Sequence, residues 1–346
     1  VDMEKKINWG VLGTGNIAHV FARALASSKT SQIYAVGSRN DLTANAFGLQ
    51  YAVPKLYSSY ESLLSDPEVQ AVYIALPHSM HAEWTKKAAK AKKHILCEKP
   101  LTINYQEALS VVEAARDNKV FLMEAFVFRG HPQTEKLREL IKSRIIGDIR
   151  VINATFSFKS EDNLIDRRVL KELGGGGILD VGCYPISMVR LIVGEVLGVN
   201  SVEPDEIFGV SYLGEAGIDE CSICCAKFSG EILAQVSCGI SVSQDNGVKI
   251  FGTEGSILIK SPWIPGGRNP AITEIILHKY NNADSETFYI ETKVGSSNFM
   301  IDHFVKSMSD RSSWASFSEE ALMNMKTLDR WRVSANVNYQ SDNKYL

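Results

Sequence analysis

The chain lacks the features that distinguish membrane-bound and nucleic-acid-binding proteins. No apolar run approaches the roughly 18 residues that a membrane-spanning helix needs, although 45% of the residues are hydrophobic. The net charge is only −3, so neither nucleic acid nor an anionic membrane is expected as a partner. Residues 1–6 are followed by a strand pattern instead of an apolar signal segment, which predicts a cytoplasmic protein.

Cysteine is scarce, and its spacing does not fit a metal site. Of the six cysteines, Cys221 and Cys224 form one C-x-x-C pair, but no second pair stands at zinc spacing and no histidine is nearby. Cys225 belongs to the same strand-like run, and Cys238 stands alone. We therefore expect no metal, and we interpret these cysteines as small buried hydrophobic residues.

The first third of the chain alternates strand and helix patterns. Apolar strand-like runs are separated by amphipathic helical patterns from residue 7 to about 125, and this alternation predicts a parallel sheet with right-handed crossovers. The strands are predicted at residues 7–12, 32–36, 71–75, 94–97 and 120–124, and the helices at 17–26, 42–48, 60–64, 80–90 and 105–118.

After about residue 130 the pattern changes to successive strands with hairpin-type turns, which predicts a large, mainly antiparallel open sheet. The fold class is therefore α/β, with a dinucleotide-binding domain of the Rossmann type at 1–125 and an α/β substrate-binding and oligomerisation domain at 126–346. The polar tail at 338–346 is expected to be frayed. The strands are predicted at 149–159, 206–213, 221–228, 232–243, 248–251, 256–259, 273–279 and 287–292, and the helices at 133–143, 180–193, 298–309 and 318–333.

A glycine motif follows the first strand and opens the first helix. In that context Gly13 permits a tight turn, Gly15 lets the backbone approach a pyrophosphate, and the small Ala18 allows close packing of helix on strand. The helix N-terminus offers unpaired N–H groups to the phosphates. The alternative is a tight turn in an unrelated α/β domain. The candidate dinucleotide-binding residues here are Gly13, Gly15, Asn16 and Ile17.

The end of the second strand favours NADP over NAD. An NAD-specific fold usually places an acid there to bind the ribose hydroxyls, but no acid occurs before Asp41. Ser38 and Arg39 offer a hydroxyl and a guanidinium instead, and the planar guanidinium suits the 2′-phosphate of NADP. The alternative is an ordinary surface arginine at the end of a strand.

Two further segments could carry chemistry. Glu98-Lys99-Pro100 follows a strand at the carboxyl edge, where open α/β sheets bind ligands; alone it is also a common loop tripeptide. Asp180 and Tyr184 follow four glycines and, being four residues apart, share one helix face.

Together these residues could perform acid–base catalysis. Hydride transfer at an alcohol needs a proton acceptor, and a tyrosine needs a nearby cation to serve at neutral pH. Lys99 could lower the pKa of Tyr184, while Asp180 orients the substrate or the lysine. The alternative for 174–184 is a flexible loop with a half-buried tyrosine.

The chain resembles the Gfo/Idh/MocA oxidoreductase family, named for glucose–fructose oxidoreductase and inositol dehydrogenase. The resemblance covers nearly the whole chain and depends on several motifs together. It implies a catalytic lysine at Lys99 and an aspartate at Asp180. Tyr184 matches the branch of glucose–fructose oxidoreductase, dimeric dihydrodiol dehydrogenase and xylose dehydrogenases, which mostly use NADP. The matching segments are Gly13 to Ala18, Leu76 to His81, Glu98 to Pro100, Glu124 to Gln133 and Gly174 to Tyr184.

The resemblance also implies further binding residues. His78 stands where the family usually has asparagine near the nicotinamide ribose, and His81 matches a family histidine, although it could simply cap a helix. Arg129 and His131 fall in a linker helix that faces the cleft; they bind substrate or are domain contacts. Additional cofactor contacts are expected from Pro77, His78, His81, Glu98, Lys99 and Arg168.

These patterns predict an NADP-dependent oxidoreductase that acts on a small sugar, polyol or cyclic trans-diol. The resemblance further implies a homodimer or homotetramer formed through the open sheet. The alternative is a non-catalytic dinucleotide-binding regulator of the same fold, since the family includes a repressor. The presence of Lys99, Asp180 and Tyr184 favours the enzyme.

Overall fold

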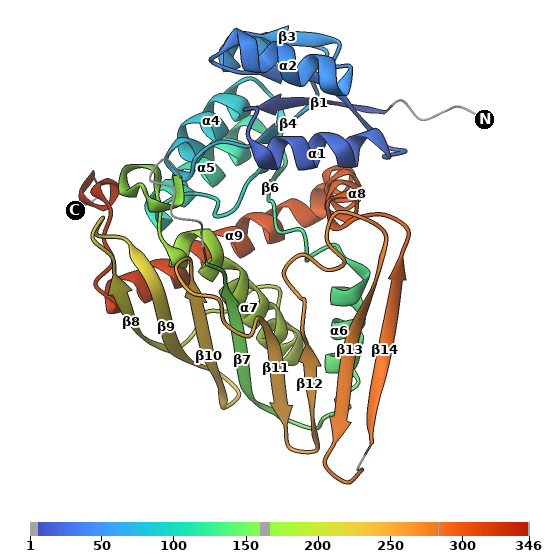
Figure 1. Ribbon diagram of the computed structural model, residues 1–346, viewed down its shortest axis with the longest axis vertical. Helices are drawn as coiled ribbons and strands as arrows, with labels where there is room; N and C mark the ends of the chain where they lie inside the picture. The colour runs from blue at the N-terminus through green and yellow to red at the C-terminus, as the bar shows by residue number, and fades with distance from the viewer. Residues whose placement is uncertain (1–5, 160–166, 283, 345–346) are drawn as a thin grey trace.

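Two β-sheets and their helices divide the molecule into an upper and a lower unit in the orientation of Figure 1. The computed structural model describes residues 6–159, 167–282 and 284–344. The upper unit is built from the first third of the chain, and the lower unit contains the larger sheet.

The upper sheet has six parallel strands in the order β3-β2-β1-β4-β5-β6, which is the doubly wound order of dinucleotide-binding folds. The predicted parallel sheet is confirmed. Within this sheet, only β3 has no counterpart in the sequence pattern, because Lys55-Leu56-Tyr57 is not part of an apolar run and two of its three residues are exposed. The elements are β1 (Ile7–Leu12), α1 (Asn16–Ala26), β2 (Ser31–Gly37), α2 (Asp41–Tyr51), β3 (Lys55–Tyr57), α3 (Tyr60–Ser65), β4 (Ala71–Ile74), α4 (His78–Lys90), β5 (His94–Cys97), α5 (Tyr105–Asn118) and β6 (Leu122–Glu124).

Helices cover both faces of this sheet. Trp9 and Val11 of β1 pack in one apolar cluster with Phe21 of α1, whereas Leu12 packs in the other cluster with Ala88 of α4. The strands therefore read as nearly continuous apolar runs, as expected for a parallel sheet that is buried on both sides.

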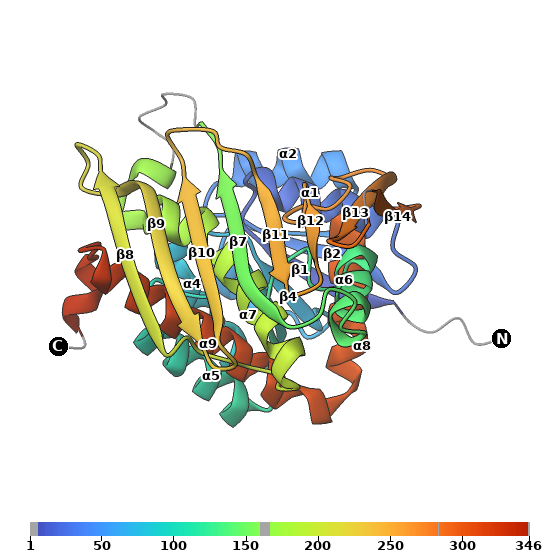
Figure 2. The ribbon, with the colours of Figure 1, turned by 90° about the horizontal axis from the view of Figure 1, so that it is seen from below.

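The lower sheet has eight strands in the order β14-β13-β12-β11-β7-β10-β9-β8. It is antiparallel except for the pairing of β7 with β10, so the mainly antiparallel sheet is confirmed. Helices lie on one side of it, as Figure 2 shows. The elements are α6 (Pro132–Lys142), β7 (Ile149–Ser157), α7 (Cys183–Leu197), β8 (Glu206–Leu213), β9 (Asp219–Phe228), β10 (Ile232–Gly239), β11 (Gly247–Gly252), β12 (Gly255–Ile259), β13 (Ala271–Lys279), β14 (Ser285–Thr292), α8 (Ser296–Ser309) and α9 (Trp314–Ser334).

Helix α7 forms the centre of the lower unit. A π-helical turn over Ile178–Gly182 leads directly into it, and such turns are frequent at functional sites. The segment Lys171–Leu197 is long and apolar enough to cross a membrane, but its most apolar stretch of 18 residues is entirely buried inside the protein. It is therefore a core helix, and its apolar composition reflects packing against β7 and β10.

The C-terminal part of the chain returns to the upper unit. Ile301 and Phe304 of α8 are buried in the same cluster as Trp9 and Phe121. The two sheets therefore lie on either side of residue 125 in the sequence, but apolar side chains from both sides of that position pack in one cluster. The tail was expected to be frayed, and for its described residues this is wrong: Tyr339 is buried, and Gln340–Lys344 forms a helical turn.

Candidate active site

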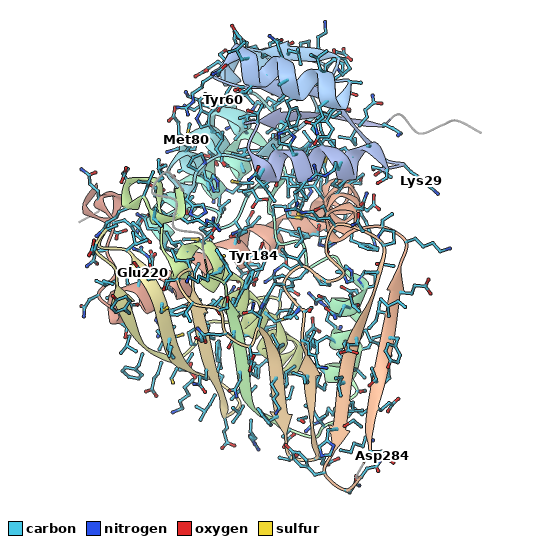
Figure 3. The ribbon with its side chains drawn as sticks, in the orientation of Figure 1. Lys29, Tyr60, Met80, Tyr184, Glu220 and Asp284 are labelled. Atoms are coloured by element: carbon cyan, nitrogen blue, oxygen red, sulfur yellow. The ribbon has the colours of Figure 1, made fainter. Side chains whose placement is uncertain are left out.

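A cleft of about 880 Å³ lies where the two units meet, and both units supply its walls. In Figure 3 the label of Tyr184 lies near the junction of the two units, and the label of Tyr60 lies in the upper unit. The cleft follows the carboxyl edge of the parallel sheet, where the strand order reverses between β1 and β4. This is the position at which doubly wound sheets bind dinucleotides.

The glycine turn after β1 has the geometry that a pyrophosphate requires. Gly13 has a φ of +98°, and a Cβ there would lie 2.7 Å from the carbonyl oxygen of Ala75, so only glycine fits. A Cβ at Gly15 would meet nothing within 4 Å, so the space beside this backbone is open. Ala18 is fully buried. Asn16 and Ile17 also line the cleft at the start of α1.

Ser38 and Arg39 line the far end of the same cleft, together with Thr43 and Tyr60. The Ser38 and Thr43 hydroxyl oxygens are 2.8 Å apart. Burial raises the pKa of Tyr60, and the positive charge of the Arg39 guanidinium offsets part of that effect. The sequence pattern predicted the helix that begins at Tyr60 but gave no signal that this side chain lines the cleft.

Lys99 and Asp180 meet at the other end of the cleft. The Lys99 Nζ donates to the Asp180 backbone carbonyl at 2.5 Å and lies 3.3 Å from the carboxylate Oδ1. The predicted convergence of the loop after β5 with the glycine segment is therefore present in the structure. Glu98 also lines the cleft and is buried; its carboxylate accepts a hydrogen bond from the Tyr73 hydroxyl.

Tyr184 forms the floor of the cleft beside them. Its ring packs edge-on against Phe126 and Phe156, with ring centroids 5.2 Å apart in each pair, and the Lys99 Nζ lies 5.1 Å from its ring centroid. We expected Lys99 to lower the pKa of Tyr184 below its ordinary value. The structure contradicts this: desolvation by burial raises the pKa of Tyr184, and the Lys99 charge opposes it only in part.

The remaining cleft residues from the sequence lie around this centre. Pro77 precedes α4, and His78 is its first residue. His78 is buried; its Nδ1 is 2.9 Å from the Gly174 carbonyl oxygen, and its Nε2 is 3.9 Å from Asp180 Oδ1. The histidine thus contacts the glycine segment itself. Arg168 lines the cleft with its guanidinium 5.0 Å from the Phe158 ring centroid.

His81 lies behind the wall of the cleft. It is fully buried, and its two ring nitrogens are 2.8 Å from the Pro100 carbonyl oxygen and 2.9 Å from that of Leu76. It therefore joins the loop after β4 to the loop after β5, and it positions the wall instead of lining it.

Arg129 and His131 make their polar contacts with other residues of the 126–346 segment, away from the cleft. Arg129 pairs with Glu320 and donates to the Ser187 hydroxyl at 2.8 Å. His131 is fully buried and begins α6, where its Nδ1 accepts from the Gln133 N–H at 3.0 Å. Burial lowers its pKa to about 4. Neither residue lines the cleft, so the expectation that they face the substrate is corrected.

The lower unit adds cleft residues from two segments. Phe156 and Phe158 come from β7 and the residues just after it, while Ile264 and Arg268 come from the loop between β12 and β13. The alternation in β7 could have indicated which side chains share a face. The loop 261–268 is expected from the sequence to shape the pocket, but its conformation depends on Ser296, whose hydroxyl lies within hydrogen-bond distance of the Pro265 and Gly267 carbonyl oxygens.

The cysteines do not gather into a metal-binding group. All six are unpaired thiols; Cys224 and Cys238 are buried, as expected of small hydrophobic residues, whereas Cys225 is exposed. Within residues 6–159, 167–282 and 284–344, no three metal-ligating side chains lie close enough to hold an ion.

Comparison with known proteins agrees with this geometry. Residues 7–126 match the profile described as "Oxidoreductase family, NAD-binding Rossmann fold", and residues 134–258 match the GFO/IDH/MocA C-terminal domain. The chain is 34% identical over 262 residues to trans-1,2-dihydrobenzene-1,2-diol dehydrogenase of Danio rerio, covering 75% of this chain and 76% of that protein. It is 32% identical over 250 residues to D-xylose 1-dehydrogenase (NADP(+)) 2 of Haloferax volcanii, covering 72% and 74%.

Among solved structures, a 3-ketoreductase from Actinomadura kijaniata, in complex with NADP and TDP-benzene, superposes with a TM-score of 0.85. The sequences are 25% identical, and the match covers 96% of this chain and 98% of that one. The fold and the cleft define a nicotinamide-dinucleotide oxidoreductase. The chain belongs to the Gfo/Idh/MocA family. The relatives named above are dehydrogenases, which supports the enzyme over the non-catalytic regulator.

Proposed function

We propose that this protein is an NADP-dependent oxidoreductase that interconverts a hydroxyl and a ketone on a sugar, polyol or cyclic trans-diol. One observation carries the proposal: Lys99, Asp180 and Tyr184 meet at one end of a cleft whose other end holds Ser38 and Arg39. The named activities of the relatives, on a dihydrodiol and on xylose, support the same substrate class. The cytoplasmic location stays a prediction.

The cofactor side of the cleft fits a dinucleotide. The open space beside Gly15 and the N-terminus of α1 would receive the pyrophosphate, and Ser38 with Arg39 would receive the 2′-phosphate of NADP. When bound, the nicotinamide donates or accepts the hydride.

Tyr184 is the acid–base group in this proposal. Lys99 stabilises negative charge on the reacting oxygen, and Asp180 fixes the ammonium group through the 3.3 Å contact. Because burial raises the pKa of Tyr184, its phenol is protonated at neutral pH. The protein is thus prepared to donate a proton in ketone reduction, whereas oxidation needs the phenolate and is favoured as the pH rises.

The test is turnover with NADPH and a panel of ketoses, diketones and cyclic hydroxyketones, followed by the reverse reaction with the matching alcohols. We expect reduction of at least one carbonyl compound, with Tyr184→Phe greatly impaired. Tight NADP binding without turnover of any member of the panel would contradict the proposal.

We further propose that the uncovered face of the lower sheet joins two copies of this chain. One face carries exposed apolar side chains from strands at both ends of the sheet, and helices lie on the other face (Figure 2). An apolar face of this extent is unusual in a monomer. The exposed residues are Phe208, Val210, Tyr212, Ile223, Leu233, Ile272 and Tyr289.

A further inference from the structure

The glycine segment before Asp180 is held from behind by a buried carboxylate. Asp219, at the start of β9, is fully buried, and its Oδ2 accepts from the Ile178 N–H at 2.6 Å and from the Ser222 hydroxyl at 3.1 Å. Ile178 is the first residue of the π-helical turn. A carboxylate at this point satisfies an N–H that the helix leaves unpaired, and it complements the helix dipole.

A tyrosine from the end of the chain holds the same segment. The Tyr339 hydroxyl donates to the Gly175 carbonyl oxygen at 2.6 Å. Between the two contacts, Gly176 has a φ of +121°, and a Cβ there would lie 2.2 Å from Asp219 Oδ1 and 2.9 Å from the Tyr339 hydroxyl. Gly176 is therefore enclosed by the two side chains, and no other residue fits this position.

Tyr339 is itself fixed by buried ionic contacts. Its backbone N–H donates to Asp342 at 2.8 Å, and Arg332 pairs with Asp342 at 3.0 Å and with Asp329 at 2.6 Å. The Arg332 guanidinium lies 5.0 Å from the Tyr339 ring centroid. Residues that follow α9 thus reach the rear of the glycine segment and are held there rigidly.

A short series of hydrogen bonds connects the glycine segment to the reacting groups. The Asp180 N–H donates to the Gly176 carbonyl oxygen at 3.1 Å, so a shift of Gly176 moves Asp180. Asp180 in turn accepts from Lys99, and Tyr184 follows one turn later. Neither Asp219 nor Tyr339 lines the cleft.

We propose that Asp219 and Tyr339 are positioning residues, which clamp the glycine segment so that Asp180 and Tyr184 are aimed into the cleft. The inference rests on the proposed function of Asp180 and Tyr184. It assigns a role in turnover to Tyr339, which follows α9 and does not line the cleft. Small misplacements of reacting groups can reduce rates about 100-fold, so the clamp acts on kcat and leaves cofactor affinity unchanged.

The experiment compares Tyr339→Phe with Tyr57→Phe in the full chain. Both variants lose one tyrosine hydroxyl that donates at 2.6 Å, but Tyr57 donates to Asp66 in the upper unit, away from the glycine segment. The first readout is amide hydrogen exchange of residues 174–184. We expect exchange there to become about tenfold faster in Tyr339→Phe, as for the loss of one hydrogen bond, and to be unchanged in Tyr57→Phe.

The second readout is kinetic. In Tyr339→Phe, kcat should fall about 10- to 100-fold with KM and NADPH affinity unchanged, and Asp219→Asn should act in the same direction. Two results for Tyr339→Phe would overturn the clamp. One is unchanged hydrogen exchange at residues 174–184. The other is faster exchange there together with a kcat no lower than that of Tyr57→Phe. If the wild type turns over no substrate, the proposed function fails separately, and hydrogen exchange alone decides whether the clamp exists.

Discussion

The two sheets of this protein differ in how their apolar strands are buried. In the upper sheet helices cover both faces, and all four residues of β4 are buried. In the lower sheet, buried and exposed residues alternate along the second half of β9, and one face bears apolar side chains such as Val210 at 70% exposure. A sheet covered on both sides can act only at the ends of its strands, whereas a half-covered sheet also offers a surface for a partner.

The active site depends on the junction of the two units, so the largest effect is expected there. Tyr184→Phe removes only a hydroxyl, and folding and NADP binding should survive. General acid–base catalysis contributes typically 10²–10⁴-fold, and turnover should fall by about that factor. Lys99→Met should be at least as harmful, because it also removes the ion pair with Asp180.

The pH–rate profile checks the same residue. Because burial raises the pKa of Tyr184 above its ordinary value near 10, the oxidation rate of the wild type should keep rising up to pH 10 without a plateau. A plateau near neutral pH that persists in Tyr184→Phe would identify another base, with Lys99 as the leading candidate.

The uncovered face predicts the next largest effect. Val210→Glu should convert the oligomer to a monomer, because an unpaired charge buried at an interface costs about 3–5 kcal/mol, which weakens association by a factor of about 10² to 4 × 10³. Leu49→Glu is the control, since Leu49 is 85% exposed on α2 in the upper unit. Light scattering at micromolar concentration measures the mass; a wild type of 38.3 kDa would refute the proposed interface.

The end of β2 predicts a smaller, cofactor-specific effect within the upper unit. Arg39→Ala should weaken NADP binding about tenfold to hundredfold and leave NAD binding nearly unchanged, since a charge-assisted contact contributes about 1.5–3 kcal/mol. Titration of both cofactors by fluorescence measures this. An equal loss for both would mean that Arg39 contacts a part they share, or acts only through Tyr60.

Glu124, at the end of β6, predicts an effect on stability and not on the reaction. Burial raises its pKa to about 8, and its Oε1 accepts from the Leu101 N–H at 2.9 Å. The folded state therefore binds an extra proton between about pH 4.5 and pH 8, so the stabilisation that this proton contributes is complete below pH 4.5 and lost as the pH rises through 8.

A glutamine keeps the shape of Glu124 and its acceptor oxygen but does not titrate. The unfolding temperature of Glu124→Gln relative to the wild type should therefore rise by several degrees between pH 5 and pH 9, since one pKa unit is about 1.4 kcal/mol and each kcal/mol shifts Tm by about 2 °C in a large chain. A constant difference across this range would show that Glu124 does not titrate with folding.

Local patterns sufficed where a residue's role follows from its chain neighbours. The glycine turn at Gly13 and Gly15 follows its strand directly, and Ser38 and Arg39 follow the next one, so strand and turn chemistry placed all four at the cleft. The alternation of strands and helices likewise predicted the parallel sheet. The strand β3 was missed because it is not part of an apolar run and two of its three residues are exposed.

Patterns within a few neighbouring residues were enough to predict the two sheets, the glycine turn and the strand-end residues at the cofactor end of the cleft, because each depends on a period or a turn. The packing of the whole chain placed Arg129 and His131 away from the cleft, made burial outweigh Lys99 at Tyr184, and brought Asp219 and Tyr339 behind the glycine segment. Tyr339 lies 164 positions from Gly175 in the chain. Desolvation and contacts over such distances depend on the packed neighbours of a residue, and no local pattern records them.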